Sequence, residues 1–184
     1  MKRRLVLATT NPGKVRELER LLADCPLEVC SLQSYPPLPP VEEDGASFLE
    51  NAVKKARAVA LHTGEMTLAD DSGIEVYALQ GAPGVHSARY AGPNATDGQN
   101  VAKLLEAMQG VPQEKRTAAF RCVLVLCMTE GNSVVFEGTW KGRISEAPCG
   151  DGGFGYDPIF FVPEAGRTAA QMTPEEKNRL SHRA

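Results

Sequence analysis

The stretch LVLATTNPGKVREL, residues 5–18, decides how the chain begins to fold. A short apolar run, residues 5–8, ends at a polar turn, and a helical pattern of apolar residues follows, formed by Val15, Leu18, Leu21 and Leu22. Asn11 can cap this helix, and Pro12 suits its first position. The stretch therefore predicts a strand, a tight turn and a helix N-terminus.

This junction is also a candidate anion site, because the first N–H groups of a helix attract negative charge. Gly13 allows a ligand to approach the backbone, and Lys14 falls near the third helical position, where a cation faces the positive end of the helix dipole. That placement is favourable if an anion lies between the lysine and the helix. The alternative is that Lys14 extends into solvent. The segment is not a Walker A loop, which requires glycine where Ala8 stands.

The rest of the chain predicts one α/β domain over residues 1–184 with a mixed sheet, without internal repeats or a long linker. Further helices are expected at 47–62 and 97–108, and a short one begins after Thr173, which can act as an N-cap. The apolar runs expected to be strands are 118–128 and 133–144, which form a hairpin, and 159–162. The segment MTLADDSGIEVYAL, residues 66–79, predicts a strand, a sharp polar turn and a second strand.

Composition excludes several functions. Of the 184 residues, 42% are hydrophobic and 23% charged, which is typical of a globular protein. The net charge of −3 argues against nucleic-acid binding by bulk electrostatics. No apolar run approaches the roughly 20 residues of a membrane span. None of the five cysteines lies in a CxxC pair, so we expect reduced thiols in a cytosolic protein rather than a metal site.

Two acidic groups are candidates for a metal site. Asp70 and Asp71 follow an apolar strand in LADDSG, and Glu42, Glu43 and Asp44 lie together in a proline-rich loop. Carboxylate oxygens suit Mg²⁺, which binds through one or two carboxylates together with substrate phosphates. A solvated acidic loop and a turn capped by an aspartate are the alternatives.

Two later segments carry groups that suit a base. In GDGGFGYDP, residues 150–158, glycines surround Phe154 and Tyr156, and an aromatic ring there can stack on a planar base. A structural loop with a buried aromatic is the alternative. The tail EEKNRLSHRA supplies Lys177, His182 and Arg183 as hydrogen-bond donors.

Together, TTNPGK, FLENAVKKA, ADDSG, GAPGVHSARYAG, GGFGYDPIF and EEKNRLSHR resemble the noncanonical purine nucleoside triphosphate pyrophosphatases, in order over about residues 5–183. The resemblance implies an elongated α/β fold, whose strongly twisted mixed sheet and flanking helices form two lobes around a central cleft. It also implies a cytoplasmic homodimer. The implied activity is Mg²⁺-dependent hydrolysis of ITP, dITP and XTP to the monophosphate and pyrophosphate, which cleanses the nucleotide pool.

The resemblance assigns roles to individual residues. Asp71 is the expected general base or metal-bound carboxylate, and Glu42 is expected to complete the metal site, with Glu43 and Asp70 as additional candidates. Phe154 is expected to stack on the purine, and His182 and Arg183 to contact the base. The remaining expected substrate-binding residues are Thr9, Thr10, Asn11, Pro12, Gly13 and Lys14 around the triphosphate, Ser72 beside Asp71, Gly155, Tyr156 and Asp157 in the base pocket, and Lys177 on the nucleotide.

The sequence departs from the family pattern at two points. Thr10 stands where the family often has a small glycine or asparagine, and the sequence stops at Ala184, where the family usually continues with another helix. Other functions also stay open: a pyrophosphatase for other modified bases, pyrimidines included, or a nucleotide-binding module without turnover. RNA binding is the weakest of these alternatives.

Overall fold

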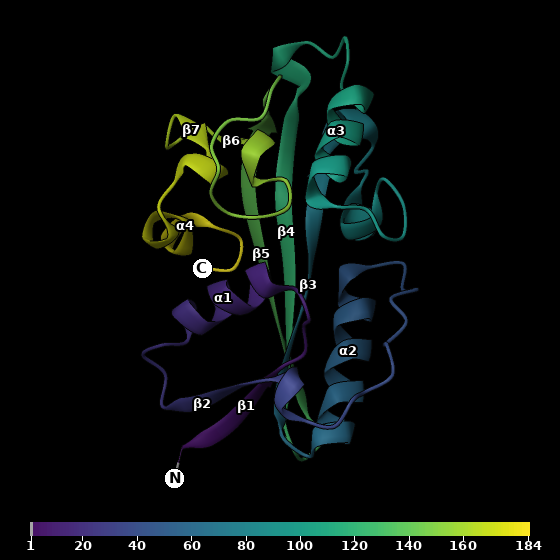
Figure 1. Cartoon of the computed structure of the whole chain (residues 1–184), viewed down its shortest axis with the longest axis vertical. Helices are drawn as coiled ribbons and strands as arrows, with labels where there is room; N and C mark the ends of the chain where they lie inside the picture. The colour runs from purple at the N-terminus through teal and green to yellow at the C-terminus, as the bar shows by residue number, and fades with distance from the viewer. Residues whose placement is uncertain (1) are drawn as a thin grey trace. The chain divides into compact units, whose positions relative to one another are not determined.

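The computed structural model describes residues 2–184 as a seven-stranded mixed sheet with flanking helices (Figure 1). The strand order is β2-β1-β3-β4-β5-β6-β7. The strands are β1 (Arg3–Leu7), β2 (Leu27–Ser31), β3 (Met66–Val76), β4 (Thr117–Cys127), β5 (Ser133–Ile144), β6 (Phe160–Val162) and β7 (Arg167–Thr168). The helices are α1 (Pro12–Leu21), α2 (Phe48–Thr63), α3 (Asp97–Ala107) and α4 (Pro174–Leu180). The predicted α/β class with a mixed sheet is confirmed.

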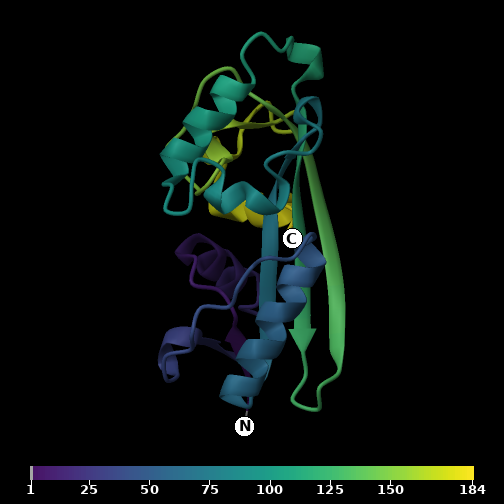
Figure 2. The ribbon, with the colours of Figure 1, turned by 90° about the vertical axis from the view of Figure 1, so that its right-hand side faces the viewer.

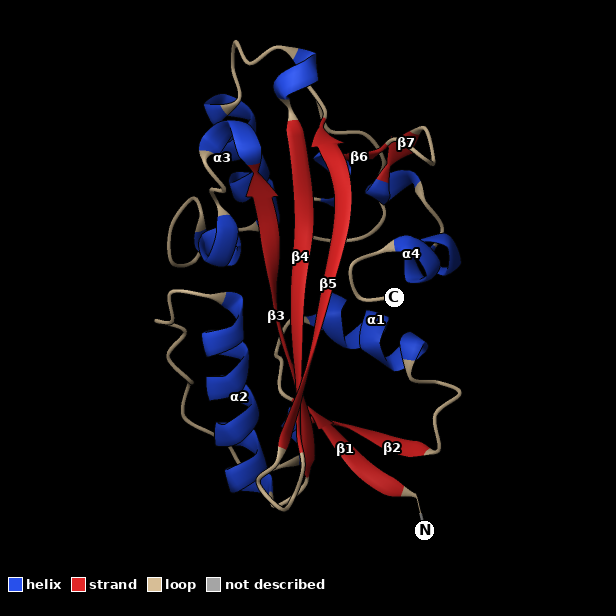
Figure 3. Ribbon diagram, turned by 180° about the vertical axis from the view of Figure 1, so that it is seen from behind, coloured by secondary structure: helices blue, strands red, loops and turns tan. Residues whose placement is uncertain are grey.

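Strand direction changes along the sheet. Strand β1 pairs in parallel with β2 and with β3, whereas β6 pairs antiparallel with both β5 and β7. The predicted hairpin is formed by β4 and β5, which run side by side in Figure 3. Because β1 and β3 are parallel neighbours, with Leu7 opposite Leu68, the polar turn after β1 lies at the same end of the strand pair as Asp70 and Asp71.

The chain divides into two compact units, and β3, β4 and β5 contribute residues to both. The first unit contains residues 1–71, 122–138 and Arg183, and the second contains 72–121, 139–182 and Ala184. The expectation of one domain stays a prediction from the sequence. Within residues 2–184, no helix combines the length and apolar character needed to cross a membrane.

The core of the first unit has two layers, because alternate residues of its strands face opposite sides of the sheet. Helix α1 packs through Leu18 against Leu5 and Leu7 of β1. Helix α2 packs through Ala52, Ala56 and Val59 against the other face, which carries Val6 and Ala69. Figure 2 shows α2 running alongside β3. The packing of α1 and α2 on opposite faces of the sheet fixes the ends of β1 and β3, where the candidate phosphate site lies.

The core of the second unit lies around α3 and the aromatic residues of β4, β5 and β6. Val101, Leu104 and Met108 supply the helical side of this cluster, and Phe120, Trp140 and Phe160 supply the aromatic side. A cap with reciprocal bonds between Thr96 and Gln99 begins α3. This core supports the glycine-rich loop and the chain up to His182.

The predicted turn between residues 66 and 79 is wrong, because β3 continues unbroken through Asp70, Asp71 and Gly73. The two carboxylates have cationic partners elsewhere in the chain, so neither caps a local turn. At Gly73 the absent side chain leaves room for Ser87, whose Oγ accepts the N–H of Ile74 at 2.9 Å. These contacts keep the segment extended.

Candidate functional site

The predicted cap at the start of α1 is present, and it uses the helix's first N–H groups. The Asn11 Oδ1 atom accepts the N–H groups of Gly13 at 2.8 Å and Lys14 at 3.1 Å, and Pro12 occupies the first helical turn. The N–H of Asn11 in turn donates to Thr9 Oγ1 at 3.2 Å. An anion at this turn would therefore meet the Lys14 ammonium and the helix dipole first, and would have to displace Asn11 to reach Gly13 N–H.

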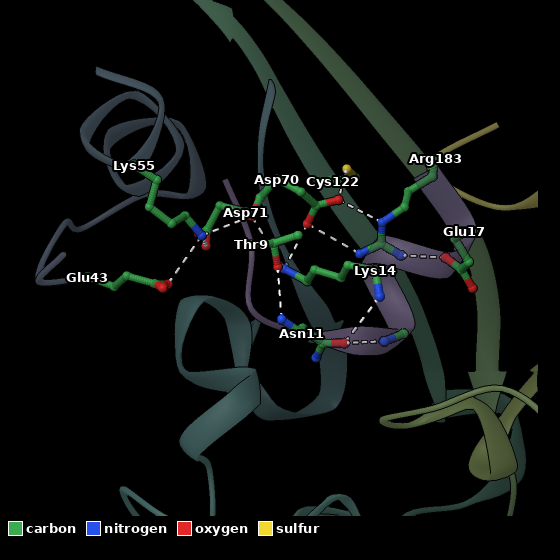
Figure 4. A network of polar contacts seen from close by, with 11 residues as sticks. Thr9, Asn11, Lys14, Glu17, Glu43, Lys55, Asp70, Asp71, Cys122 and Arg183 are labelled. Atoms are coloured by element: carbon green, nitrogen blue, oxygen red, sulfur yellow. Dashed lines mark hydrogen bonds and ion pairs between the residues drawn. The ribbon is translucent and has the colours of Figure 1, made fainter. Parts of the chain in front are cut away.

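Asp70 is the centre of a buried charge network in the first unit (Figure 4). Its carboxylate binds Lys14 Nζ at 2.7 Å and Arg183 Nε at 2.6 Å, and no part of its side chain is exposed. Arg183 Nη1 also binds Glu17 Oε2 at 3.0 Å. Cys122 Sγ lies 3.4 Å from Asp70 Oδ2. Asp70 thus holds Lys14, the lysine of the candidate anion site. Asp70 is itself held by Arg183, which is far from it in sequence.

These partners determine ionisation within the network. Burial alone would raise the pKa of Asp70, but Arg183 and Lys14 override it and hold the pKa of this carboxyl well below its usual range. Burial, together with the Asp70 charge, raises the pKa of the Cys122 thiol. At neutral pH, Asp70 is therefore a carboxylate and Cys122 a neutral thiol.

Asp71, the next residue in β3, lies in a different environment. Lys55 Nζ, from α2, binds Asp71 Oδ1 at 2.7 Å and donates to the Asp70 carbonyl oxygen at 2.9 Å. The same ammonium lies 3.4 Å from Glu43 Oε2 of the acidic loop. Burial raises the pKa of Asp71, and the nearby Lys55 offsets only part of that increase. A carboxylate with a raised pKa is a better proton acceptor than an ordinary aspartate.

The glycine-rich loop of the second unit is held by two carboxylates. Asp157 Oδ2 accepts the N–H of Phe154 at 2.9 Å and binds the Lys177 ammonium in a buried ion pair. The Asp97 Oδ2 atom, in the first turn of α3, accepts the N–H of Gly155 at 2.7 Å. The Lys177 Nζ atom lies 4.7 Å from the centre of the Phe154 ring. The Lys177 ammonium therefore lies over one face of the Phe154 ring.

Tyr156 and His182 are two further expected residues in the second unit. The Tyr156 hydroxyl donates to the Ser87 carbonyl oxygen at 2.7 Å, and burial raises the pKa of this phenol. The His182 ring stacks on Phe120, with centroids 4.9 Å apart and planes 13° apart. Tyr156 is therefore a structural anchor for the loop, and His182 has a defined ring plane.

Comparison with known proteins places this geometry in a family. The model of the Ham1 family matches residues 5–184. A dITP/XTP pyrophosphatase of Geobacillus kaustophilus is 52% identical over 180 residues, which cover 98% of this chain and 88% of that protein. One of Yersinia pseudotuberculosis is 54% identical over 182 residues, covering 98% of this chain and 92% of that protein.

The chain belongs to the Ham1 family. Solved structures agree: the Ham1 protein of Staphylococcus aureus superposes with a TM-score of 0.86 at 40% identity, covering 98% of this chain and 92% of that one. The Ham1 protein of Coxiella burnetii gives the same TM-score at 44% identity, with the same coverage. The resemblance expected from the sequence motifs is confirmed, and so is the fold class.

The structure distributes the expected site residues between the two units. Lys14 and Asp71 lie in the first, each bonded to a neighbour of opposite charge. Thr10 is exposed at the same turn, and Ser72 follows Asp71 as a half-buried residue. Lys177, His182 and the loop of Phe154, Gly155, Tyr156 and Asp157 lie in the second unit.

Arg183 has partners other than those expected of it. Helix α4 ends at Leu180, and the guanidinium of Arg183 is almost fully buried between Asp70 and Glu17 in the first unit. His182, its neighbour in sequence, belongs to the aromatic core of the second. The two residues expected to contact the base together thus have separate surroundings.

Several residues that bind the expected site residues were not predicted from the sequence. Lys55, Glu17 and Asp97 bind the expected residues, but each lies far from its partner in sequence. Lys55 lies within the FLENAVKKA motif, so the motif marked the right helix without identifying the residue. Glu17 follows Lys14 by three residues on α1, a spacing that places both on one helix face.

The acidic residues offer a small number of carboxylate ligands for a hard cation such as Mg²⁺. Among the described residues, no three histidine, cysteine or acidic side chains converge on a metal position. Asp71 and Glu43, however, already share a cation, the Lys55 ammonium. Glu42 is exposed beside them. A donor set of one or two carboxylates suits Mg²⁺, whose remaining ligands are water and phosphate oxygens.

Proposed function

We propose that this chain hydrolyses noncanonical purine nucleoside triphosphates, dITP, ITP and XTP, to the monophosphate and pyrophosphate. One observation carries the proposal: Asp71, a carboxylate with a raised pKa, directly follows Asp70, the carboxylate that holds the anion-site Lys14. A proton acceptor thus lies beside a phosphate-binding cation within one unit. The names of the Ham1 relatives as dITP/XTP pyrophosphatases support the choice of substrate.

In the proposed reaction, water attacks the α-phosphorus. A bond forms between the water oxygen and this phosphorus, the bond from the phosphorus to the α–β bridging oxygen breaks, and pyrophosphate leaves with the bridging oxygen. Asp71 orients the water and takes its proton. Lys14 neutralises charge on the outer phosphates. Binding the triphosphate weakens the pair between Lys14 and Asp70, while Arg183 keeps Asp70 in place.

We propose Mg²⁺ as the cofactor, held by Asp71 and a carboxylate of the acidic loop. When bound, it supplies charge neutralisation at the phosphate oxygens and at the leaving group. Lys55 holds Asp71 and Glu43 in the structure, so these side chains are already oriented toward a shared cation. Release of Lys55 from Asp71 leaves the aspartate available to the metal or to the attacking water.

The choice between Glu42 and Glu43 as the second ligand can be tested by matched substitutions. Contact with Lys55 favours Glu43, and the family resemblance favours Glu42. Glu43→Gln and Glu42→Gln are compared for the Mg²⁺ concentration that gives half-maximal rate, with isothermal titration of Mg²⁺ as a second readout. The variant that raises this concentration tenfold or more identifies the ligand, and no change in either would remove the loop from the metal site.

We propose that base selection depends on donors near position 6 of the purine. Hypoxanthine and xanthine carry a carbonyl there, which accepts from a donor such as His182, whereas adenine carries an amino group. When two hydrogen-bond donors face each other in a buried site, both remain unpaired, which costs about 1–3 kcal/mol for each donor. Because Arg183 is bound to Asp70 and Glu17, we expect Arg183→Ala to reduce ITP and ATP turnover equally, and His182→Ala to reduce ITP turnover more.

The test of the whole proposal is a substrate panel of ITP, dITP, XTP, ATP, GTP and dTTP, measured as pyrophosphate release with Mg²⁺ or EDTA. We expect fast, Mg²⁺-dependent release from ITP, dITP and XTP only. Comparable rates with dTTP would favour the second candidate, a pyrophosphatase for other modified bases. ITP binding without pyrophosphate release would indicate a binding module.

We further propose a homodimer, with an apolar surface of the first unit as its interface. Val134 and Phe136, which share one face of β5, are 47% and 53% exposed, and neighbouring apolar side chains of this kind are costly in water. Sedimentation velocity of Phe136→Asp is the test. We expect dimers for the parent chain and monomers for the variant, and a parent chain that is monomeric at high concentration would refute the dimer.

We also propose a cytoplasmic location. All five cysteines are free thiols, as predicted, and three of them are buried. Free thiols persist in a reducing compartment. Fractionation of cells that express the chain, with immunodetection, is expected to find it in the cytoplasmic fraction, and recovery from another compartment would contradict the proposal.

A further inference from the structure

The ring of His182 rests on an aromatic floor, which we define as Phe120 of β4 and Trp140 of β5. The His182 centroid lies 4.9 Å from that of Phe120 and 6.4 Å from that of Trp140, with planes 13° and 21° apart. The two floor rings are nearly parallel to each other, 22° apart. The imidazole therefore lies flat over both.

A third ring braces this floor. The Phe160 ring of β6 is tilted by 52° to Phe120 and by 51° to Trp140, at centroid distances of 4.5 Å and 5.1 Å. Gly142 of β5 leaves space for it, because a side chain there would begin 2.6 Å from Phe160 Cζ. All three rings are buried. Neighbouring strands thus hold the floor rigidly in place.

Trp140 has a feature that packing alone does not explain. Its indole Nε1 is buried and has no hydrogen-bond partner among the described residues. A buried donor without a partner destabilises the folded state. Phenylalanine would fill the core without that cost, so the benefit of tryptophan here lies in its larger face, which extends beneath His182.

We propose that Trp140 is a positioning residue that determines specificity: together with Phe120, it fixes the plane of the His182 ring for recognition of the purine base. The inference rests on the proposed function, in which His182 donates to the base. Hydrogen bonds weaken steeply as their angle departs from linearity. A donor whose ring plane is fixed distinguishes a carbonyl from an amino group, whereas a donor that can tilt accommodates both.

The consequence is a loss of discrimination rather than a loss of turnover. Without the floor, His182 can tilt away from an opposing amino group, so adenine is rejected less strongly. The ratio of kcat/KM for ITP to that for ATP is expected to fall by about fivefold to tenfold, within the range set by one unpaired buried group. Most of the change is expected in KM, chiefly as a lower KM for ATP, because weaker rejection of adenine improves ATP binding and the floor touches no reacting atom.

The experiment compares Trp140→Leu, which removes the aromatic face, with Trp140→Phe, which keeps a smaller one. We expect the ITP-to-ATP ratio to fall in Trp140→Leu and to fall by a smaller amount in Trp140→Phe. Leu104→Val is the control for a general core defect, since Leu104 belongs to the same core on α3. An equal fall in the Leu104 and Trp140 variants, or an unchanged ratio in Trp140→Leu, would overturn the proposal.

A second variant and an NMR measurement test the positioning role in addition. If Trp140→Leu does not fold, Phe120→Leu removes the ring nearer to His182, and the same fall in the ratio is expected from it. NMR of the His182 ring protons requires no turnover: the parent chain is expected to show upfield shifts from the neighbouring rings, reduced in Trp140→Leu. Unchanged shifts would refute the positioning role, whereas failure of the parent chain to hydrolyse ITP would refute the proposed function instead.

Discussion

Asp70 and Asp71 are neighbours in one strand, yet their pKa values shift in opposite directions. Two cations contact the carboxylate of Asp70 and override the effect of its burial. Asp71 is buried with Lys55 as its close cationic partner, and its pKa is raised. The alternation of side chains along a strand separates the two environments. One aspartate therefore serves structure, and the other is suited to proton transfer.

The base role of Asp71 predicts the effect of Asp71→Asn. Loss of a general base lowers the rate by about 10²- to 10⁴-fold, and we expect kcat for ITP to fall by that amount at saturating Mg²⁺. In the parent chain, activity needs the ionised carboxylate, so the rate falls as pH drops through its pKa. The pKa of Asp71 is raised in the metal-free chain, and a bound cation lowers it, so the acid limb is expected to move to lower pH as the Mg²⁺ concentration rises.

A pH–rate profile and a matched variant check this prediction. Asp44→Asn, on the exposed loop beside Lys54, removes an aspartate without touching Asp71 and is the control. Near-normal turnover in Asp71→Asn would exclude the base role. An acid limb that does not move with the Mg²⁺ concentration would exclude Asp71 as a metal ligand.

The structural role of Asp70 predicts a loss of stability in Asp70→Asn. The change leaves Arg183 and Lys14 without a buried counter-charge, which costs about 3–5 kcal/mol. The folded-state pKa of Asp70 lies below its unfolded value near 3.9, so its contribution is complete above that value and is lost as pH falls toward the folded-state pKa. Urea unfolding between pH 7 and pH 3 measures both effects.

Glu28→Gln, at an exposed ion pair with Arg4, is the control for that experiment and is expected to cost less than about 1 kcal/mol. If the free energy of unfolding of Asp70→Asn differed from that of the parent chain by less than about 1 kcal/mol, the structural role of Asp70 would be contradicted.

At this scale the sequence predicted the carboxylates and the lysine of the first turn. It could not predict Lys55 or Glu17, because those partners come together only when the chain folds.

At the scale of elements, helices were predicted better than strands. The caps at Asn11, Ser47 and Thr173 are local signals, and each begins a helix as expected. Strand β2 was not predicted, since it pairs with β1 from the far side of α1, and β7 was not predicted because it is only two residues long. The turn expected within β3 was wrong because distant cations and Ser87, rather than local bonds, satisfy its polar groups.

The glycine-rich loop gives a prediction for an element. Gly153 has a φ of +73°, and a side chain there would collide with the Asp157 carboxylate. Gly153→Ala is therefore expected to displace Asp157 from Lys177 and from Phe154 N–H, and to raise KM for ITP several-fold. Gly166→Ala, with a φ of +65° and open space around it, controls for the backbone cost alone, about 1 kcal/mol. Equal KM values in the two variants would contradict the role of the loop.

At the scale of the whole molecule, the chain is a member of the Ham1 family whose polar and aromatic groups separate into two chemical sets. The first unit holds the cations and carboxylates suited to a triphosphate and a metal. The second holds the aromatic loop and His182, suited to a base. The sequence motifs predicted this family, while the partners of Arg183 and His182 became apparent only from the folded chain.

Hydrolysis of ITP in ¹⁸O-labelled water, with mass analysis of both products, tests the central claim most directly. We expect IMP and pyrophosphate in equal amounts, with one ¹⁸O atom in IMP and none in pyrophosphate, because water attacks the α-phosphorus. The label in pyrophosphate, release of orthophosphate with IDP, or no hydrolysis of ITP would each contradict the account.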